Sequence, residues 1–174
     1  MIRNWLKPDW EPCLGIPNLP IEHLLDIGIK AIVLDVDGTL IPRNETNLHE
    51  SVKLWIERAK VNLDLHLLSN NPSKKRIKYI SNQLNLDFTY NAAKPSSKAL
   101  RKALLEFNQD SKRIAIVGDR IFTDILVGNR LGLYTILVRP LDGDGKIKAN
   151  SKFQKFEKSI AALFGASQQW LFGL

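Results

Sequence analysis

Short apolar runs alternate with amphipathic stretches along most of this 174-residue chain. The apolar runs are rich in β-branched residues, as strands buried on both faces are. They predict strands over 30–35, 65–69, 88–90, 113–118 and 133–138. The stretches between them repeat apolar residues every three or four positions, which is typical of helices that bury one face. These helices are expected over 48–61, from Pro72 through Leu84, over 96–107 and over 121–131.

Strands that alternate with helices predict an α/β fold, a doubly wound parallel sheet with helices on both faces. The length fits a single domain spanning 1–174, with the core motifs inside 30–140. A Gly- and Asp-rich loop is expected over 141–150. The tail predicts a C-terminal amphipathic helix over about 151–172 that closes the fold. Its apolar residues at helical spacing are Phe153, Phe156, Ile160, Leu163 and Phe164.

Ligands of parallel sheets bind at the carboxyl ends of the strands, so the residues after each apolar run carry the candidate chemistry. The first such group is Asp35-Val36-Asp37-Gly38-Thr39. Its two carboxylates, two residues apart, converge if the chain turns at Gly38. One carboxylate can attack phosphorus while the other moves protons. By itself, however, an Asp-Gly pair at a strand end also fits an ordinary turn.

Polar residues follow the next strands as well. Ser69 and Asn70 end the second run, where a hydroxyl and helix N–H groups can bind a phosphoryl oxygen. An ordinary helix cap explains Ser69 equally well. Lys94 precedes a proline and can neutralise charge in a pocket, although an exposed loop lysine fits its position too.

A pair of acids, Asp119 and Asp124, follows the fourth run. Asp119 ends the predicted strand, and Asp124 lies near the start of the next helix. Carboxylates of this kind suit a hard, oxygen-seeking cation such as Mg²⁺. A helix N-terminal acid is the alternative for Asp124.

The order of these groups is more specific than any one of them. DVDGT, then a Ser after the second strand, then a Lys, then GDRIFTD resemble the four motifs of the haloacid dehalogenase (HAD) superfamily. The resemblance covers Asp35 to Asp124. It implies a doubly wound α/β fold and phosphoryl transfer through an aspartyl-phosphate, with Mg²⁺ as the cofactor.

The same resemblance implies a role for each matched residue. Asp35 would be the nucleophile and a magnesium ligand. Asp37 would be the general acid and base, and its backbone carbonyl would also bind the metal. Thr39 and Ser69 would hold the phosphoryl group, with Asn70 beside them.

It also assigns the charged residues that follow. Lys94 would offset negative charge in the pocket. Asp119 would be a further metal contact, and Asp124 either a direct ligand or an acid just behind the ligands.

Two short gaps between motifs limit what can cover the site. Only 31 residues separate Asp37 from Ser69, and 24 separate Ser69 from Lys94. Neither gap can hold the cap domain found in many HAD phosphatases, so the chain resembles the capless subclass III. The lead-in LKPDWEPCLGIPNLP, together with LLSNNP and GDRIFTDILVGNRLG, is similar to the YqeG-like phosphatidylglycerophosphate phosphatases. That similarity implies removal of phosphate from phosphatidylglycerophosphate.

The cysteine count and the apolar runs of the chain restrict its cellular compartment but do not identify its substrate. The single cysteine, Cys13, excludes a disulfide within the chain and a multi-cysteine zinc site. The start of the chain lacks the apolar stretch of a signal peptide. No apolar run approaches the roughly 20 residues of a transmembrane helix. We therefore expect a cytoplasmic protein, with peripheral membrane contact open to it.

The net charge of +7 favours partners that carry phosphate. A lipid headgroup on an anionic membrane fits the basic residues Lys74, Lys75, Arg76 and Lys78, unless these merely form a solvated helix face. A soluble phosphatase for a sugar phosphate, nucleotide or polynucleotide end is the enzyme alternative, and a non-catalytic phosphate-binding scaffold is another. Nucleic acid is disfavoured because no aromatic-rich binding motif is present. An open site also allows a homo-oligomer in which a neighbouring subunit covers it.

Overall fold

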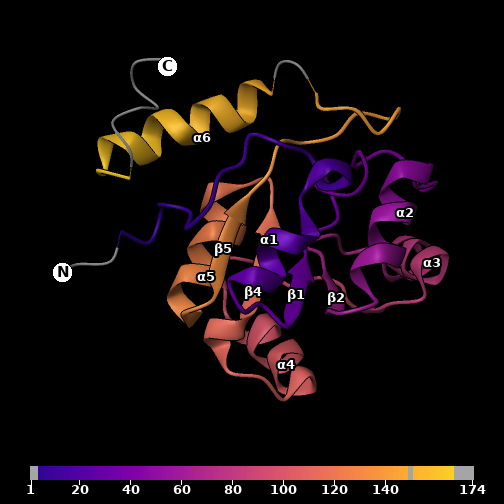
Figure 1. The fold of residues 1–174 in the computed structure, drawn as a ribbon. Coiled ribbons are helices and arrows are strands. Elements are labelled where there is room, and N and C mark those ends of the chain that lie inside the picture. Colours follow the sequence, from indigo (N-terminus) through magenta and orange to yellow (C-terminus); the bar gives the residue numbers. More distant parts are fainter. Residues whose placement is uncertain (1–3, 149–150, 167–174) are drawn as a thin grey trace.

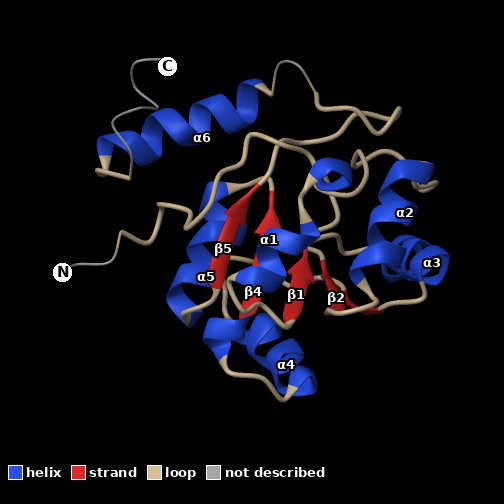
Figure 2. Ribbon diagram, viewed as in Figure 1, coloured by secondary structure: helices blue, strands red, loops and turns tan. Residues whose placement is uncertain are grey.

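The computed structural model describes residues 4–148 and 151–166 (Figure 1). Its centre is a five-stranded, fully parallel sheet in the order β3-β2-β1-β4-β5 (Figure 2). The strands are β1 Ala31–Leu34, β2 Asp64–Leu68, β3 Asp87–Thr89, β4 Ile114–Gly118 and β5 Tyr134–Leu137. Each lies on a predicted run to within about one residue, so the predicted fold class is confirmed.

Helices and short turns connect the strands. The α-helices are α1 Ile21–Asp26, α2 Glu50–Ala59, α3 Lys74–Leu84, α4 Lys98–Phe107, α5 Leu126–Leu131 and α6 Lys152–Leu163. The turns are η1 Ile16–Asn18, η2 Ser111–Arg113 and η3 Ile121–Ile125, the last a π-helical turn that leads into α5. Neither η1 nor α1 was predicted. Among the described helices, none combines the length and apolarity needed to cross a bilayer.

Both faces of the sheet are buried. On β1, Ile32 and Leu34 pack in one apolar cluster with residues of α1, α2 and α3. The alternate residues Ala31 and Val33 pack in a second cluster with residues of α4 and α5. Because successive side chains of a strand point to opposite faces, this alternation places helices on both sides of the sheet. The fold is therefore doubly wound.

The strand order reverses beside β1. The chain builds β1, β2 and β3 toward one edge and then returns to add β4 and β5 on the other side of β1. Such a reversal opens a crevice outside the carboxyl ends of the two central strands. In Figure 1 all strands run toward the same side of the molecule, where α6 also lies. Residues that follow β1 and β4 therefore meet in this crevice.

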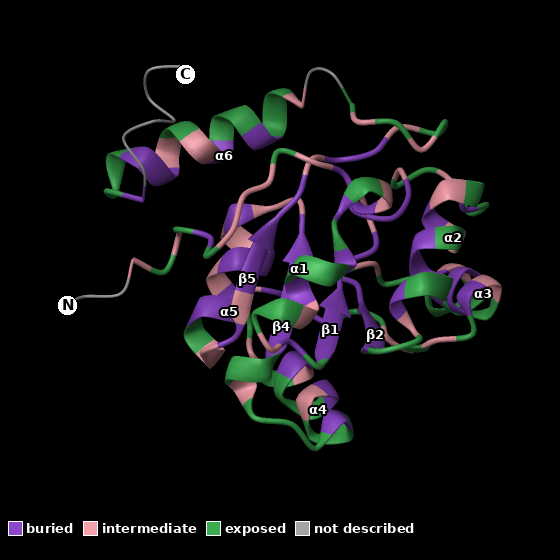
Figure 3. Ribbon diagram, viewed as in Figure 1, coloured by how far each residue is buried: buried purple, intermediate pink, exposed green. Residues whose placement is uncertain are grey.

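The closing helix differs from expectation in length and in the face that it buries. α6 ends at Leu163, and positions 167–172 of the predicted helix lie outside the described part of the chain. Its buried residues are Gln154, Glu157, Ala161 and Ala162. Phe153, Phe156, Leu163 and Phe164 are all exposed, and Ile160 is half-buried. Figure 3 shows this division between a buried side and an exposed side. The helix therefore turns two polar side chains and two alanines inward and leaves its large apolar side chains outside.

Candidate active site

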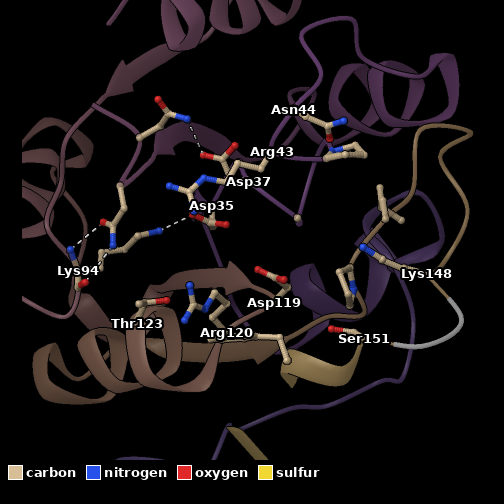
Figure 4. Close-up of a pocket in the computed structure, with 17 residues that line it drawn as sticks. Asp35, Asp37, Arg43, Asn44, Lys94, Asp119, Arg120, Thr123, Lys148 and Ser151 are labelled. Carbon is tan, nitrogen blue, oxygen red and sulfur yellow. Dashed lines mark hydrogen bonds and ion pairs between the residues drawn. The ribbon is translucent and has the colours of Figure 1, made fainter. Parts of the chain in front are cut away.

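A cavity of about 570 Å³ opens at the carboxyl edge of the sheet (Figure 4). Asp35 and Asp37 line it after β1, and Asp119 lines it after β4. Lys94 enters it from the loop between β3 and α4. The other charged and aromatic residues of its lining are Arg43, Arg120, Lys148 and Phe153. The cavity thus joins the charged residues that the resemblance assigned to the site, except Asp124.

Asp35 lies buried at the centre of this cavity. Its Oδ1 accepts a hydrogen bond from Lys94 Nζ at 2.5 Å, and its Oδ2 accepts one from Thr39 Oγ1 at 3.2 Å. Burial raises the pKa of Asp35 to about 7, although the Lys94 ammonium pulls it in the opposite direction. A further positive charge nearby would favour the carboxylate form that a nucleophile needs.

Lys94 connects two of the acids. Its Nζ lies 2.5 Å from Asp35 Oδ1 and 2.7 Å from Asp124 Oδ1, and it also donates to Leu68 O at 2.9 Å. Burial alone would lower the pKa of Lys94, but Asp124 and Asp35 outweigh it and raise the pKa above its ordinary value. The Asn70 amide fixes this lysine by two hydrogen bonds to its backbone, of 2.7 and 3.0 Å. Lys94 is therefore held as a fixed positive charge.

Three carboxylates meet beside Lys94. One oxygen each from Asp35, Asp119 and Asp124 lies within 4.8 Å of the others. Asp119 Oδ1 is buried and has no hydrogen-bond partner among the described residues. Burial, followed by the charges of Asp35 and Asp124, raises the pKa of Asp119 well above its usual range. A small divalent cation that prefers oxygen ligands fits this arrangement, because it would bind the unpartnered oxygen and offset the repulsion.

Two glycines allow the backbone to approach these acids. Gly38 has φ = +94°, and a Cβ there would lie 2.6 Å from Asp119 Oδ2. A Cβ on Gly118 would lie 2.3 Å from the carboxylate carbon of Asp124. Any larger residue at either position would displace a member of the cluster. Both glycines therefore have a packing role, and Gly38 has a conformational one as well.

Asp37 faces the cavity from the side opposite Asp119 in Figure 4. Its Oδ1 accepts a 2.7 Å hydrogen bond from Arg76 Nη1. Its Oδ2 accepts hydrogen bonds from Ser69 Oγ at 3.1 Å and Asn71 Nδ2 at 3.4 Å. The acidic cluster does not include the Asp37 side chain.

The structure places the two hydroxyls of the resemblance behind the carboxylates. Thr39 and Ser69 are fully buried, and their hydroxyls contact Asp35 and Asp37 respectively. Neither lines the cavity, whereas Asn70 does. In this arrangement the hydroxyls orient the carboxylates of Asp35 and Asp37, and their contact with a phosphoryl group stays a prediction.

The position of Arg76 contradicts one expectation for the basic residues at the start of α3. The expectation placed it with Lys74, Lys75 and Lys78 on a surface facing lipid. In the structure its guanidinium pairs with Asp37 and also donates to Pro42 O and Glu45 O. It lies in the first turn of α3, and helix side chains point back toward the N-terminus of their helix, here the carboxyl edge of the sheet. The position of Arg76 near the start of the helix was the signal in the sequence that could have predicted its contact with the site.

Residues of α6 also reach the site, and no short motif indicated them. Gln154 Nε2 donates to Asp119 O at 2.9 Å and to Val138 O at 2.8 Å. Glu157 Oε2 accepts from Ile121 N at 2.8 Å, and its Oε1 accepts from Arg120 at 3.1 Å. The helix thus holds the loop that carries Asp119.

Comparison with known families agrees with this geometry. The family model described as Mitochondrial PGP phosphatase, where PGP denotes phosphatidylglycerophosphate, matches residues 12–141. The chain belongs to this family. The match includes every residue of the cavity named above that precedes α6, apart from Lys148. The protein is a HAD-type phosphoric monoester hydrolase, as the order of its motifs predicted.

Individual relatives extend the similarity over most of the chain. The Bacillus subtilis protein named probable phosphatase YqeG is 33% identical over 149 residues, which cover 84% of this chain and 86% of that one. The mitochondrial phosphatidylglycerophosphatase GEP4 of Saccharomyces cerevisiae is 29% identical and covers 93% of this chain and 96% of its own. A Legionella pneumophila structure assigned to subfamily III A of the HAD superfamily superposes with a TM-score of 0.52 at 16% identity, covering 83% and 92% of the two chains. This last likeness shows the fold alone.

Proposed function

We propose that this protein removes the terminal phosphate of phosphatidylglycerophosphate and releases phosphatidylglycerol. The name of the matched family supports this substrate, as does the name of the yeast relative, almost all of which the chain covers. The observation that carries the chemistry is the position of Asp35, a buried carboxylate that pairs with Lys94 and has an oxygen within 4.8 Å of both acids that follow β4.

In the first step, an Asp35 carboxylate oxygen attacks the phosphorus of the monoester. A phosphorus–oxygen bond forms to Asp35 while the bond to the glycerol oxygen breaks. Asp37 donates a proton to that departing oxygen, which leaves as the hydroxyl of phosphatidylglycerol. Lys94 offsets negative charge on the phosphoryl oxygens during the transfer.

In the second step, water attacks the phosphorus of the aspartyl-phosphate. Asp37, now a carboxylate, accepts a proton from that water, and the bond between phosphorus and the Asp35 oxygen breaks. Inorganic phosphate leaves, and both carboxylates return to their initial forms. The position of Asp37 in the cavity lining, beside Asp35, supports both roles.

Mg²⁺ is the cofactor that this donor set suits best. Asp35, Asp119 and Asp124 would hold it, and the backbone carbonyl of Asp37 is the further ligand that the family resemblance assigns. When bound, the cation would reduce the repulsion between a phosphate dianion and the Asp35 carboxylate.

The basic lining of the cavity suits a substrate with a second phosphate. Phosphatidylglycerophosphate carries a phosphodiester in addition to its terminal monoester. Arg43 and Lys148 line the cavity and offer positive charge to that second group, whereas Arg120 lines it with its guanidinium paired to Glu157. A small monoester lacks it and would gain less from these residues.

Phosphate release from a substrate panel tests the substrate. The panel contains phosphatidylglycerophosphate in mixed micelles, glycerol 3-phosphate, sugar phosphates and nucleotides, each with Mg²⁺. We expect the highest kcat/KM for the lipid. A higher kcat/KM for a sugar phosphate or a nucleotide would contradict the lipid substrate and favour a soluble phosphatase.

Borohydride trapping tests the intermediate. Reduction of an acyl phosphate at Asp35 converts that residue to homoserine, which mass spectrometry of the peptide containing residue 35 detects. Reduction of a different carboxylate, or no homoserine at position 35 during turnover, would contradict the assignment of Asp35 as the nucleophile.

A further inference from the structure

The outer side of α6 carries a run of apolar side chains that no described residue covers. Phe153, Phe156, Leu163 and Phe164 are 55%, 61%, 76% and 70% exposed. At 3.6 residues per turn these positions form a single stripe along the helix, roughly 100° wide. Soluble proteins rarely leave aromatic residues clustered in this way unless the surface binds something. The stripe is therefore a candidate docking surface.

This stripe continues into the active-site cavity. Phe153 belongs to the stripe and also lines the cavity. Its ring lies 4.2 Å from the guanidinium carbon of Arg120, which lines the cavity too. Exposed basic residues flank this junction, with Lys148 in the cavity lining and Lys152 in the first turn of α6. Whatever covers the stripe would lie directly against the cavity.

The buried side of the same helix holds the loop of the acidic cluster. Gln154 binds the backbone carbonyl of Asp119, and Glu157 binds the backbone N–H of Ile121. One helix therefore joins an exposed apolar surface to the loop that carries Asp119. A partner bound to the outer side would fix the orientation of the cavity relative to itself.

The charge and shape of this surface favour an anionic bilayer as that partner. Helices that lie in a membrane interface combine a stripe of Phe and Leu with Lys beside it, as α6 does. Basic residues near an anionic leaflet add to the attraction. A second copy of the chain fits less well, because each copy carries a net charge of +7 and would bring its own Arg43 and Lys148 to the contact.

We propose that α6 is a membrane-docking helix, whose outer side inserts Phe156, Leu163 and Phe164 into the headgroup region of an anionic phospholipid bilayer. Phe153 would lie at the boundary between bilayer and cavity. The proposal deepens the proposed function and rests on it for the benefit of docking, since a lipid substrate would then enter without leaving the membrane.

Vesicle sedimentation tests the proposal with a matched pair of variants. One replaces Phe156, Leu163 and Phe164 by Ser. The control replaces three exposed apolar residues elsewhere, Leu54, Val61 and Leu105, by Ser. With vesicles of equal parts phosphatidylglycerol and phosphatidylcholine, we expect the α6 variant to bind at least about tenfold more weakly than wild type, and the control to bind as wild type does.

Activity measurements separate docking from catalysis. Hydrolysis of p-nitrophenyl phosphate, a small soluble ester, should be the same in wild type and in the α6 variant. Hydrolysis of phosphatidylglycerophosphate in vesicles should fall with the loss of binding. Equal vesicle binding by wild type and the α6 variant would overturn the docking proposal even if the lipid is the substrate. Vesicle binding without phosphate release from the lipid would instead overturn the proposed function and leave docking in place.

A fluorescent label gives a second measurement that needs no loss of binding. Cys13 is the only cysteine and is exposed, so Cys13→Ser allows labelling at Phe156→Cys, or at Leu105→Cys as the control. An environment-sensitive dye at 156 should shift to the blue when phosphatidylglycerol vesicles are added, and the dye at 105 should not. If the emission of the dye at 156 is already shifted to the blue without vesicles, protein covers the stripe and the proposal is overturned. A wild-type dimer that the α6 variant no longer forms would overturn it in the same way.

Discussion

Arg76 Nη1 lies 2.7 Å from Asp37 Oδ1, and the same guanidinium donates to the carbonyls of Pro42 and Glu45. This contact ties the proposed general acid to the loop that follows DVDGT. It fixes the direction of the carboxylate on one side, while Ser69 and Asn71 fix it on the other. A residue of α3 thus positions a residue that follows β1.

Removing the contact between Arg76 and Asp37 should slow turnover more than it weakens the binding of substrate. We expect Arg76→Met to lower kcat by about a hundredfold, because a misdirected Asp37 loses much of its value as acid and base. Arg76→Lys should recover part of the loss, since one donor remains. Lys75→Met, at an exposed position in the same turn, should stay within about twofold of wild type. An Arg76→Met enzyme with normal kcat would show that Asp37 needs no such partner.

Asp35→Asn should abolish turnover and leave the fold intact. The amide keeps the shape of the side chain but cannot form the acyl phosphate, so the covalent route is lost at a cost of several kcal/mol in the barrier, equivalent to more than about a hundredfold in rate. Circular dichroism checks the fold and phosphate release checks the rate. Asp64→Asn, an exposed change on β2, is the matched control. More than about a tenth of wild-type activity in Asp35→Asn would refute the nucleophile.

Activity should require Mg²⁺, and the metal should also stabilise the fold. Saturation at 100 times the dissociation constant adds about 2.7 kcal/mol to the free energy of unfolding, which thermal melting detects without any substrate. Excess chelator should remove both the activity and the thermal shift. Full activity in metal-free protein would contradict the requirement.

The acids of the cluster should differ in what they contribute. Asp119→Ala should weaken Mg²⁺ affinity more than Asp124→Ala does, and should not destabilise the metal-free protein, because Asp119 Oδ1 has no hydrogen-bond partner among the described residues. Asp124→Ala should destabilise the metal-free protein, because it removes the 2.7 Å ion pair with Lys94. Melting temperatures of both variants, with and without Mg²⁺, check this order. The reverse order would exchange the two roles.

His66 should make the fold sensitive to acid. Burial lowers its pKa below the ordinary 6.5, although the charge of Glu106 opposes this, and its Nε2 lies 2.9 Å from Thr89 Oγ1. As pH falls through about 6.5, the unfolded chain takes up a proton that the folded chain binds less readily, so stability present above this pH is lost. Denaturant unfolding at pH 7.5 and 5.5 should show a smaller loss in His66→Gln than in wild type. Equal losses would mean that His66 does not titrate differently in the two states.

The sequence by itself determined the sheet and the centre of the site. Strands buried on both faces leave continuous apolar runs, and the residues that follow such runs must meet at one edge of a parallel sheet. That reasoning found Asp35, Asp37, Lys94 and Asp119, which the structure brings to one cavity. Local pattern was sufficient because each of these residues follows its strand or lies in a short connection.

Tertiary structure alone decided which partners these residues have. Arg76 and Asp37 lie 39 positions apart, and nothing local to either residue specifies their ion pair. The orientation of α6 is the clearer case, because its periodicity predicted an apolar face turned inward. The surface that it covers includes backbone groups at Asp119, Ile121 and Val138, and buried backbone groups must find hydrogen-bond partners. Gln154 and Glu157 supply them, and further along the helix the small Ala161 packs in the apolar cluster of Ile121, Ile125 and Leu137. The inward face is therefore polar at one end and small at the other, and the phenylalanines remain outside.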